Sequence, residues 1–272
     1  MTEAQTLCWL NLVEQRTGIW FGRQPKILVA GVLRRMRDLK CHDTDEYLGR
    51  LSDTASGRLE WSQLVNEITV KETRFFRDPG VYDSLRGYLQ QRMPRVPRGH
   101  SLDMWSVGSA TGEEAYSMMM LAREVAELSA PQCFYGITGT DISSSALTIA
   151  RQGVYFRRSL SGLSEQRLRC HFSRDTKDDG YQVVEEIRER VCFIRSNMLE
   201  MDNLPTMKMD VIFCLNVLVY FREKHCHTVL DGLVERLKPG GILVFGQNEA
   251  VSWKNSFIQK LPNRHINAFL RQ

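Results

Sequence analysis

A glycine-rich segment with adjacent acidic residues, GSATGEE at 108–114, has the composition of a small-molecule site. It follows the apolar run 102–107, which predicts a strand, and it leads into 113–127, which predicts a helix. Glycines at such a turn let the backbone approach a ligand closely, at the carboxyl end of the strand where open α/β sheets bind ligands. Loops of this composition also serve as simple tight turns, so the segment alone does not establish a site.

Asp141 supplies a second candidate group, at the end of the next predicted strand, 134–140. A carboxylate there can accept hydrogen bonds from both hydroxyls of a ribose. Dinucleotide-binding enzymes carry this acid about 20 residues after the glycine motif. Asp141 lies 33 residues after Gly108, which disfavours an NAD-dependent oxidoreductase. Asp141 could instead serve only to cap a helix that begins near Ser143, and the two roles are compatible.

Two other features invite a functional interpretation and are better explained as structure. The turn LKPGG at 237–241 joins a predicted helix to a late strand, and its residues need not touch a ligand. His225, Cys226 and His227 are adjacent on that predicted helix, so their side chains do not face one another. The seven cysteines include no CxxC pair. No metal site is therefore expected.

The apolar pattern divides the 272 residues into two parts. Residues 1–91 predict a helical domain, and 92–100, with two prolines and a glycine, predict a linker. Residues 101–272 alternate short apolar runs with amphipathic segments, which predicts a doubly wound, mostly parallel α/β sheet whose last strand is antiparallel. Residues 172–190 break the alternation and predict a small β insertion.

Composition limits the class of protein. Hydrophobic residues make up 43% and charged residues 25%, which is ordinary for a globular chain with its own core. The sequence begins without the basic segment and apolar run of a signal peptide. No stretch has the apolar length of a membrane span. We expect a reduced, cytoplasmic protein without direct membrane insertion.

The helix predicted from Pro25 to about residue 40 has two distinct faces. Its apolar stripe, at helical spacing, consists of Leu28, Val32, Met36 and Leu39. The basic residues opposite or beside that stripe are Lys26, Arg34, Arg37 and Lys40. This face complements an acidic helical partner, although an isolated basic cluster is often only a solvated surface.

Six segments together resemble one family. They are TRFFRD (73–78), WSVGSATGEEAYS (105–117), TDISSSALTIARQGVY (140–155), SNMLE (196–200), FCLNVLVYF (213–221) and LKPGGILVFGQNE (237–249). In these motifs the chain is similar to the CheR family of chemoreceptor glutamate methyltransferases. The resemblance covers nearly the whole chain, including the helical domain and the β insertion. It implies transfer of a methyl group from S-adenosylmethionine to glutamate side chains of a bacterial chemosensory receptor, which yields glutamate methyl esters and S-adenosylhomocysteine.

The resemblance also implies which residues form the site. Cofactor contacts are expected at Thr73, Arg77, Gly108, Ala110, Glu114, Asp141, Asn197, Met198, Asn216 and Val217. Three positions depart from the family pattern: Lys71 stands where many relatives have asparagine, Leu215 where they often have arginine, and Ala115 where proline is common. The substitution at Lys71 leaves one cofactor contact open.

Arg77 and Tyr220 are the candidate catalytic residues. Arg77 could hold the substrate carboxylate, because its planar fork matches two oxygens, or it could hold the carboxylate of the cofactor. Tyr220 could orient the acceptor oxygen or could be a core residue. The implied partner is the acidic helical bundle of the receptor, docked on the basic helix face, and a receptor tail peptide could add to the β insertion. No nucleic-acid partner is expected. The alternatives are an S-adenosylmethionine methyltransferase with another substrate and a receptor-binding adaptor without turnover.

Overall fold

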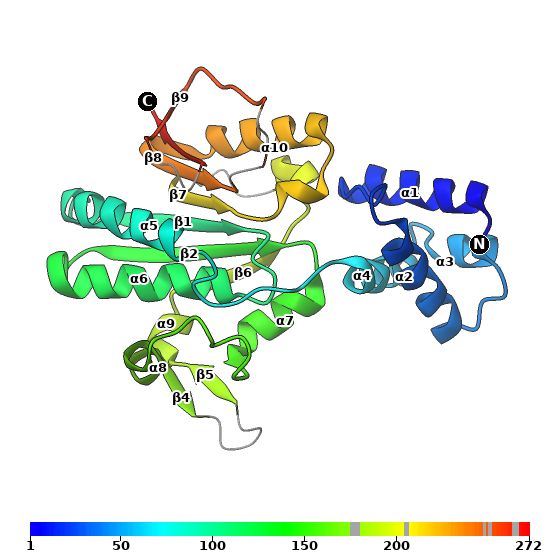
Figure 1. The fold of residues 1–272 in the computed structure, drawn as a ribbon, viewed down its shortest axis with the longest axis horizontal. Coiled ribbons are helices and arrows are strands. Elements are labelled where there is room, and N and C mark those ends of the chain that lie inside the picture. Colours follow the sequence, from blue (N-terminus) through cyan, green and yellow to red (C-terminus); the bar gives the residue numbers. More distant parts are fainter. Residues whose placement is uncertain (175–179, 204–206, 247–248, 250–251, 263–266) are drawn as a thin grey trace.

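The computed structural model describes residues 1–272 except 175–179, 204–206, 247–248, 250–251 and 263–266 (Figure 1). Its first part is helical, as predicted, and lies at one end of the molecule (Figure 1). The helices there are α1 (Glu3–Thr17), α2 (Pro25–Asp38), α3 (Thr44–Arg50) and α4 (Ala55–Ile68). Their shared core contains Trp9, Val13, Leu28, Val32 and Tyr47.

Local sequence signals set the ends of these helices. Thr2 and Gln5 form the reciprocal capping box at the start of α1. Gly18 ends the helix in the left-handed region with φ 76°, which favours glycine. A Cβ atom there would also lie 2.5 Å from the ring of Phe221. Gly18 therefore both ends α1 and allows the helical domain to approach the α/β part.

Helix α2 has the two faces that its sequence predicts. Pro25 occupies its first turn, and Leu28, Val32 and Met36 are buried. The four basic residues predicted for docking, Lys26, Arg34, Arg37 and Lys40, are all exposed.

The described part of residues 101–272 contains a sheet of seven strands in the order β6-β2-β1-β7-β8-β10-β9. The first five run parallel, and β10 and β9 are each antiparallel to their neighbour. The bounds are β1 (Ser101–Val107), β2 (Phe134–Asp141), β6 (Val191–Arg195), β7 (Met209–Cys214), β8 (Leu237–Phe245), β9 (Ile258–Lys260) and β10 (Asn267–Arg271). This confirms the prediction of a mostly parallel sheet with an antiparallel last strand.

Helices cover both faces of this sheet (Figure 1). They are α5 (Pro79–Arg92), α6 (Glu113–Ser129), α7 (Ser144–Gln152) and α10 (Glu223–Glu235), with short 3₁₀ segments η1 (Met93–Arg95), η2 (Met198–Asn203) and η3 (Leu218–Tyr220). Along β7, Val211 and Phe213 join the core under α5 and α6, whereas Ile212 and Cys214 join the core under α10. A strand buried on both faces reads as a continuous apolar run, which is why 209–215 was recognisable from sequence.

The expected β insertion is present and recruits one strand from outside the predicted range. A small antiparallel sheet has the order β3-β5-β4, with bounds β3 (Val154–Tyr155), β4 (Phe172–Arg174) and β5 (Tyr181–Val183). The flanking helices are α8 (Glu165–His171) and α9 (Glu185–Arg188). Residues 175–179, which fall in the predicted turn, lie outside the described residues.

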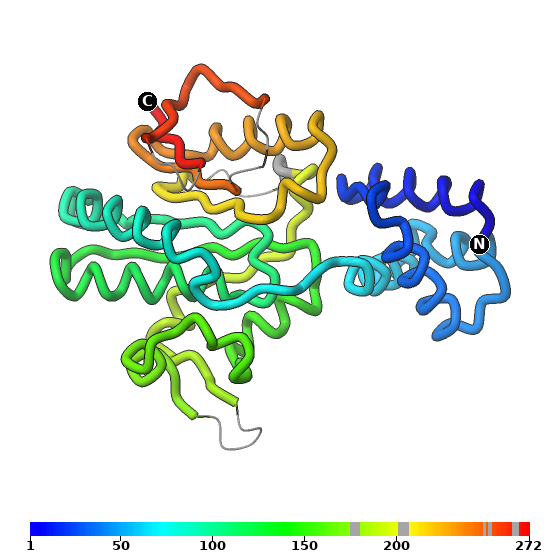
Figure 2. Tube along the Cα trace, in the orientation of Figure 1, coloured from blue at the N-terminus to red at the C-terminus, as the bar shows by residue number. Residues whose placement is uncertain are grey.

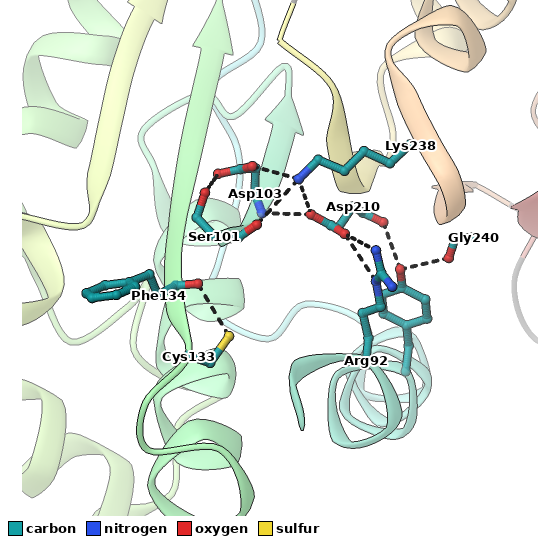
Figure 3. A network of polar contacts seen from close by, with 9 residues as sticks. Arg92, Ser101, Asp103, Cys133, Phe134, Asp210, Lys238 and Gly240 are labelled. Atoms are coloured by element: carbon teal, nitrogen blue, oxygen red, sulfur yellow. Dashed lines mark hydrogen bonds and ion pairs between the residues drawn. The ribbon is translucent and has the colours of Figure 1, made fainter. Parts of the chain in front are cut away.

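Helix α5 packs on the sheet and not on the helices that precede it in the chain. This placement differs from the domain boundary predicted at the linker 92–100. Tyr88 donates to the backbone oxygens of Asp210 and Gly240 at 3.1 and 3.0 Å. Arg92 donates twice to the carboxylate of Asp210, which is also paired with Lys238 at 2.6 Å (Figure 3). The side chain of Asp210 is only 2% exposed, so its charge needs these partners. Because α4 connects to α5 by a segment without regular structure (Figure 2), we propose that the domain boundary lies at 69–78.

The segment 237–241, predicted as a turn before the last parallel strand, is part of β8. It begins pairing already at Leu237, opposite Met209, and the register shifts before Ile242 pairs with Val211. Gly240, with φ 74°, lies within this irregular stretch. The two glycines therefore create an irregularity inside the strand instead of a loop ahead of it.

Candidate functional site

A cavity of about 470 Å³ lies where the helical domain meets the sheet. This volume falls in the range typical of small-molecule sites. Every predicted cofactor-contacting or catalytic residue lines it, namely Thr73, Arg77, Gly108, Ala110, Glu114, Asp141, Asn197, Met198, Asn216, Val217 and Tyr220. The structure thus brings together positions that are up to 147 residues apart in the sequence, from Thr73 to Tyr220.

The loop after β1 has a backbone that only certain residues can adopt easily. Gly108 has φ 70°, and a Cβ atom on it would lie 2.5 Å from Cγ2 of Val217. Ala110 in the same loop has a positive φ of 46°, and Asn216, which follows β7, has one of 58°. A non-glycine residue in this region is uncommon, and such residues cluster at functional sites. The loop is held in this form by its neighbours.

Asp141 holds the glycine-rich loop from the end of β2. Its carboxylate accepts from the backbone N–H of Ala110 and of Ser143, both at 2.8 Å. Ser143, and not Asp141, occupies the N-cap of α7, where its hydroxyl accepts from Ala146. Burial raises the pKa of Asp141, and the N–H donors from Ser143 and Ala110 partly offset that effect. The N–H of Ile142 also lowers this pKa, and because a carboxylate offers about four acceptor positions, a ribose hydroxyl can still bind.

Glu114 carries a strongly perturbed carboxylate in the cavity. Burial raises its pKa to about 7, although the hydroxyl of Ser106 donates to it at 2.8 Å and so favours its ionised form. The nearby carboxylate of Glu249 raises this pKa further, whereas Arg77 lowers it. A carboxylate that titrates near neutrality, in a cavity, is typical of a functional site.

The segment 73–77 is anchored by its two phenylalanines. Phe75 is fully buried and packs edge-on against Tyr155. Phe76, with φ 48°, is buried too, and its N–H donates to the hydroxyl of Ser117. These contacts fix the backbone on either side, so Thr73 and Arg77 face the cavity.

Tyr220 is presented by the short η3 segment. Its side chain lines the cavity and the residue is 38% exposed, so the alternative that it is a core residue is wrong. Its backbone oxygen accepts from the N–H of Trp20 at 2.7 Å, and Ile19 forms a β-bridge with Phe221. This contact joins the helical domain to the side of the cavity that Tyr220 lines.

The connection between α1 and α2 lines the cavity and was missed from sequence. It contributes Trp20, Phe21, Arg23 and Gln24. Asn197 also reaches this domain, because its side-chain amide donates to the backbone oxygen of Arg16 at 2.8 Å. No motif marks 19–24, and only the tertiary contact with η3 reveals its role.

Glu249 was also missed from sequence; it does not line the cavity, but its carboxylate raises the pKa of Glu114. It is 4% exposed and accepts from the N–H groups of Gly246 and Val219. The available sequence signal was an acidic residue at the end of the motif LKPGGILVFGQNE, four residues after β8 ends at Phe245.

The four predicted docking residues lie away from the cavity, since none of them lines it. Arg34 donates to Glu67 at 2.6 Å, so part of its charge is compensated. In the described part of the chain no group of three or more His, Cys, Asp or Glu residues is placed to hold a metal ion. His225 faces Glu14 while His227 faces Ser252, so the two histidines diverge as their spacing predicts.

Comparisons with known proteins identify the family. The family model for the SAM-binding domain of CheR methyltransferases matches residues 71–266, and the model for their all-alpha domain matches residues 8–69. Chemotaxis protein methyltransferase 2 of Vibrio cholerae is 32% identical, over 88% of this chain and 82% of the relative. The chemotaxis protein methyltransferase of Escherichia coli is 31% identical, over 89% of this chain and 82% of the relative.

A third relative differs in its name and its length. The probable biofilm formation methyltransferase WspC of Pseudomonas aeruginosa is 32% identical over 82% of this chain, but the match covers only 51% of that protein. Among the described helices, none combines the length and the apolar character needed to cross a membrane. From its matched domains, this chain belongs to the CheR methyltransferase family and is an S-adenosylmethionine-dependent methyltransferase.

Proposed function

We propose that this enzyme esterifies specific glutamate side chains on the cytoplasmic helical bundle of a chemosensory receptor. The observation that carries the proposal is the position of Arg77. It is anchored through the buried Phe76 and lines the same cavity as Asp141 and Glu114. A guanidinium at the wall of a methyl-donor site suits an anionic acceptor. The names of the chemotaxis relatives support the same substrate class.

The acceptor needs no general base. A free glutamate has a pKa near 4.3, so its carboxylate is already ionised at neutral pH. When bound, S-adenosylmethionine supplies a methyl group on a cationic sulfur, which a carboxylate oxygen can attack directly. What the protein must provide is alignment and exclusion of water, and positioning of this kind can contribute about 7–11 kcal/mol to lowering a barrier.

Arg77 and Tyr220 have complementary roles in this proposal. The fork of Arg77 binds the acceptor carboxylate and fixes its plane. Burial raises the pKa of the Tyr220 hydroxyl, although Arg77 lowers it. Tyr220 therefore stays protonated at neutral pH and can donate a hydrogen bond to an acceptor oxygen.

The remaining residues of the cavity hold the donor. Asp141 accepts the ribose hydroxyls, and the Gly108–Ala110 backbone lies beside the amino-acid portion. Asn197 and Met198 flank the adenine, with Asn216 and Val217 on the opposite loop. Their common placement around one cavity supports this assignment.

The receptor is proposed to dock on the exposed basic face of α2. Reversing Arg34 and Arg37 together to glutamate should lower kcat/KM for a receptor fragment on the order of tenfold, because it replaces attraction by repulsion toward an acidic helix. Calorimetry with S-adenosylhomocysteine should show unchanged affinity, since neither residue lines the cavity. The kcat/KM of the neutral variant Arg34→Gln/Arg37→Gln should lie between those of the wild type and the reversed variant. Normal kinetics in the reversed variant would exclude α2 as the docking face.

A second contact with the receptor is proposed at the β insertion. In the order β3-β5-β4, strand β4 is an edge of the small sheet among the described residues. An extended tail peptide can add to such an edge through backbone hydrogen bonds. Both proposed contacts require the enzyme to act in the cytoplasm, where the receptor bundle lies.

The activity can be tested with purified enzyme, methyl-labelled S-adenosylmethionine and bacterial membranes rich in candidate receptors. The expected result is label on a receptor that mild base releases, as it does from an ester. Label that resists base, or that appears on a small molecule or nucleic acid, would indicate another substrate. Absence of transfer together with receptor binding would indicate an adaptor.

Glu114 should make binding of the donor depend on pH. With a pKa of about 7, this carboxyl is largely neutral at pH 6 and largely ionised at pH 8. A cationic donor favours the ionised form, so its affinity should rise as pH increases through 7. If the donor lowers the pKa by about one unit, the affinity rises about fivefold between pH 6 and pH 8. Calorimetry from pH 6 to 8 should show a smaller rise in affinity for S-adenosylhomocysteine, because its sulfur is uncharged. Glu114→Gln should remove the difference between the two ligands, and an equal pH dependence for both in the wild type would contradict this role.

A further inference from the structure

A second cavity, of about 700 Å³, adjoins the donor cavity. The two share Glu72, Thr73, Arg74 and Arg77. The segment 72–77 is therefore a common wall, with the donor cavity on one side and the second cavity on the other. The far side of the second cavity is formed by residues 158–161, in the loop that follows β3.

Positive charge dominates the lining of this second cavity. Lys71, Arg74, Arg77 and Arg158 line it, against the two acidic residues Glu72 and Glu113. Burial raises the pKa of Glu113, whereas the hydroxyl of Thr111, which donates to it at 2.6 Å, favours its ionised form.

These cations can bind an external anion. In the described part of the chain none of Lys71, Arg77 and Arg158 forms an ion pair, although Lys71 and Arg77 lie close enough to Asp141 and Glu114 to lower the pKa of those carboxyls. Arg74, Arg77 and Arg158 are exposed and Lys71 is partly buried. A cleft lined by one sign of charge raises the local concentration of ligands of the opposite sign.

Two adjoining cavities suit methyl transfer, because the donor and the acceptor must approach each other from opposite sides. In an in-line displacement the acceptor oxygen must approach the methyl group from the side opposite the sulfur. A donor in the first cavity and an acceptor entering from the second would meet at the wall that both cavities share, where Arg77 lies. An acceptor coming through the donor cavity itself would compete with the donor for space.

We propose that the second cavity is the entry channel for the acceptor, in which Lys71, Arg74 and Arg158 bind acidic residues of the receptor helix on either side of the target glutamate. This inference rests on the proposed function. It assigns Arg158 and its neighbours to substrate selection, separate from docking on α2. It also gives Lys71 a role toward the receptor.

Reversing one charge tests the channel. Arg158→Glu is suitable because Arg158 lines the second cavity and not the first. Arg98→Glu is the matched control, since Arg98 is exposed and lines neither cavity. It precedes β1, at the end of the strand opposite the glycine-rich loop. The substrate is a purified cytoplasmic receptor fragment that the wild-type enzyme methylates.

Arg158→Glu should lower kcat/KM for this fragment on the order of tenfold relative to Arg98→Glu, and should reduce its dependence on salt. Affinity for S-adenosylhomocysteine and the thermal unfolding temperature should match the control. A receptor fragment with lysine in place of the acidic neighbours of the target glutamate should restore activity to Arg158→Glu while it impairs the wild type.

Two results would overturn the channel while the wild type still methylates the receptor. One is kcat/KM for Arg158→Glu within twofold of the control. The other is weaker binding of S-adenosylhomocysteine by Arg158→Glu, which would assign the second cavity to the donor. A wild-type enzyme that methylates no receptor glutamate would refute the proposed function itself, and the channel with it.

Discussion

Replacing Arg77 with alanine is expected to reduce receptor methylation on the order of a hundred- to a thousandfold, comparable with the loss of a positioned donor at other active sites. The side chain lies at the junction of the two cavities, where it is proposed to hold the acceptor carboxylate. Steady-state methylation of a receptor fragment measures the effect. Arg77→Lys should retain only a small part of the wild-type activity, because an ammonium group lacks the planar fork of a guanidinium.

The same variant separates the two roles that the sequence left open for Arg77. If it holds the acceptor, Arg77→Ala should bind S-adenosylhomocysteine as tightly as the wild type does. If it holds the carboxylate of the donor, that affinity should fall with the activity. Near-normal methylation by Arg77→Ala would reject both roles.

Removing the carboxylate of Asp141 should produce the second large effect. Asp141→Ala is expected to weaken binding of S-adenosylmethionine and of S-adenosylhomocysteine about 10- to 100-fold, as expected for lost hydrogen bonds to a charged group. Two causes act together: the ribose loses its acceptor, and the N–H of Ala110 loses the partner that holds the loop. Calorimetry measures both affinities.

Asp141→Asn is the informative companion to that variant. Its amide oxygen can keep one of the two backbone bonds, so the affinity should fall between those of the wild type and Asp141→Ala. Thermal unfolding without ligand shows whether either variant has lost the fold. Unchanged affinity in a folded Asp141→Ala protein would remove Asp141 from the donor site.

The strands and the site residues could be predicted because their signals are local. A strand buried on both faces shows as an apolar run, as residues 211–214 do in β7 after the charged Asp210. The glycine-rich loop, Asp141 and the FFR motif are short segments whose family resemblance fixes their positions. Every residue expected in the cofactor site lines one cavity.

The placement of α5 could not be predicted, because it depends on long-range packing. Its helical pattern and the prolines after it are compatible with either domain. What assigns it to the sheet is the pairing of Arg92 with Asp210, 118 residues away. The contribution of 19–24 to the cavity is hidden for the same reason, since it arises from a bridge between Ile19 and Phe221.

The central claim is that this cavity and Arg77 together esterify a receptor glutamate. It is tested most directly by incubating a receptor cytoplasmic fragment with the enzyme and methyl-deuterated S-adenosylmethionine, followed by tandem mass spectrometry of its peptides. We expect deuterated methyl groups on glutamate side chains with the wild-type enzyme, and on the order of a hundredfold less or lower with Arg77→Ala. Methyl groups on any other kind of side chain, or equal glutamate labelling by both enzymes, would contradict it.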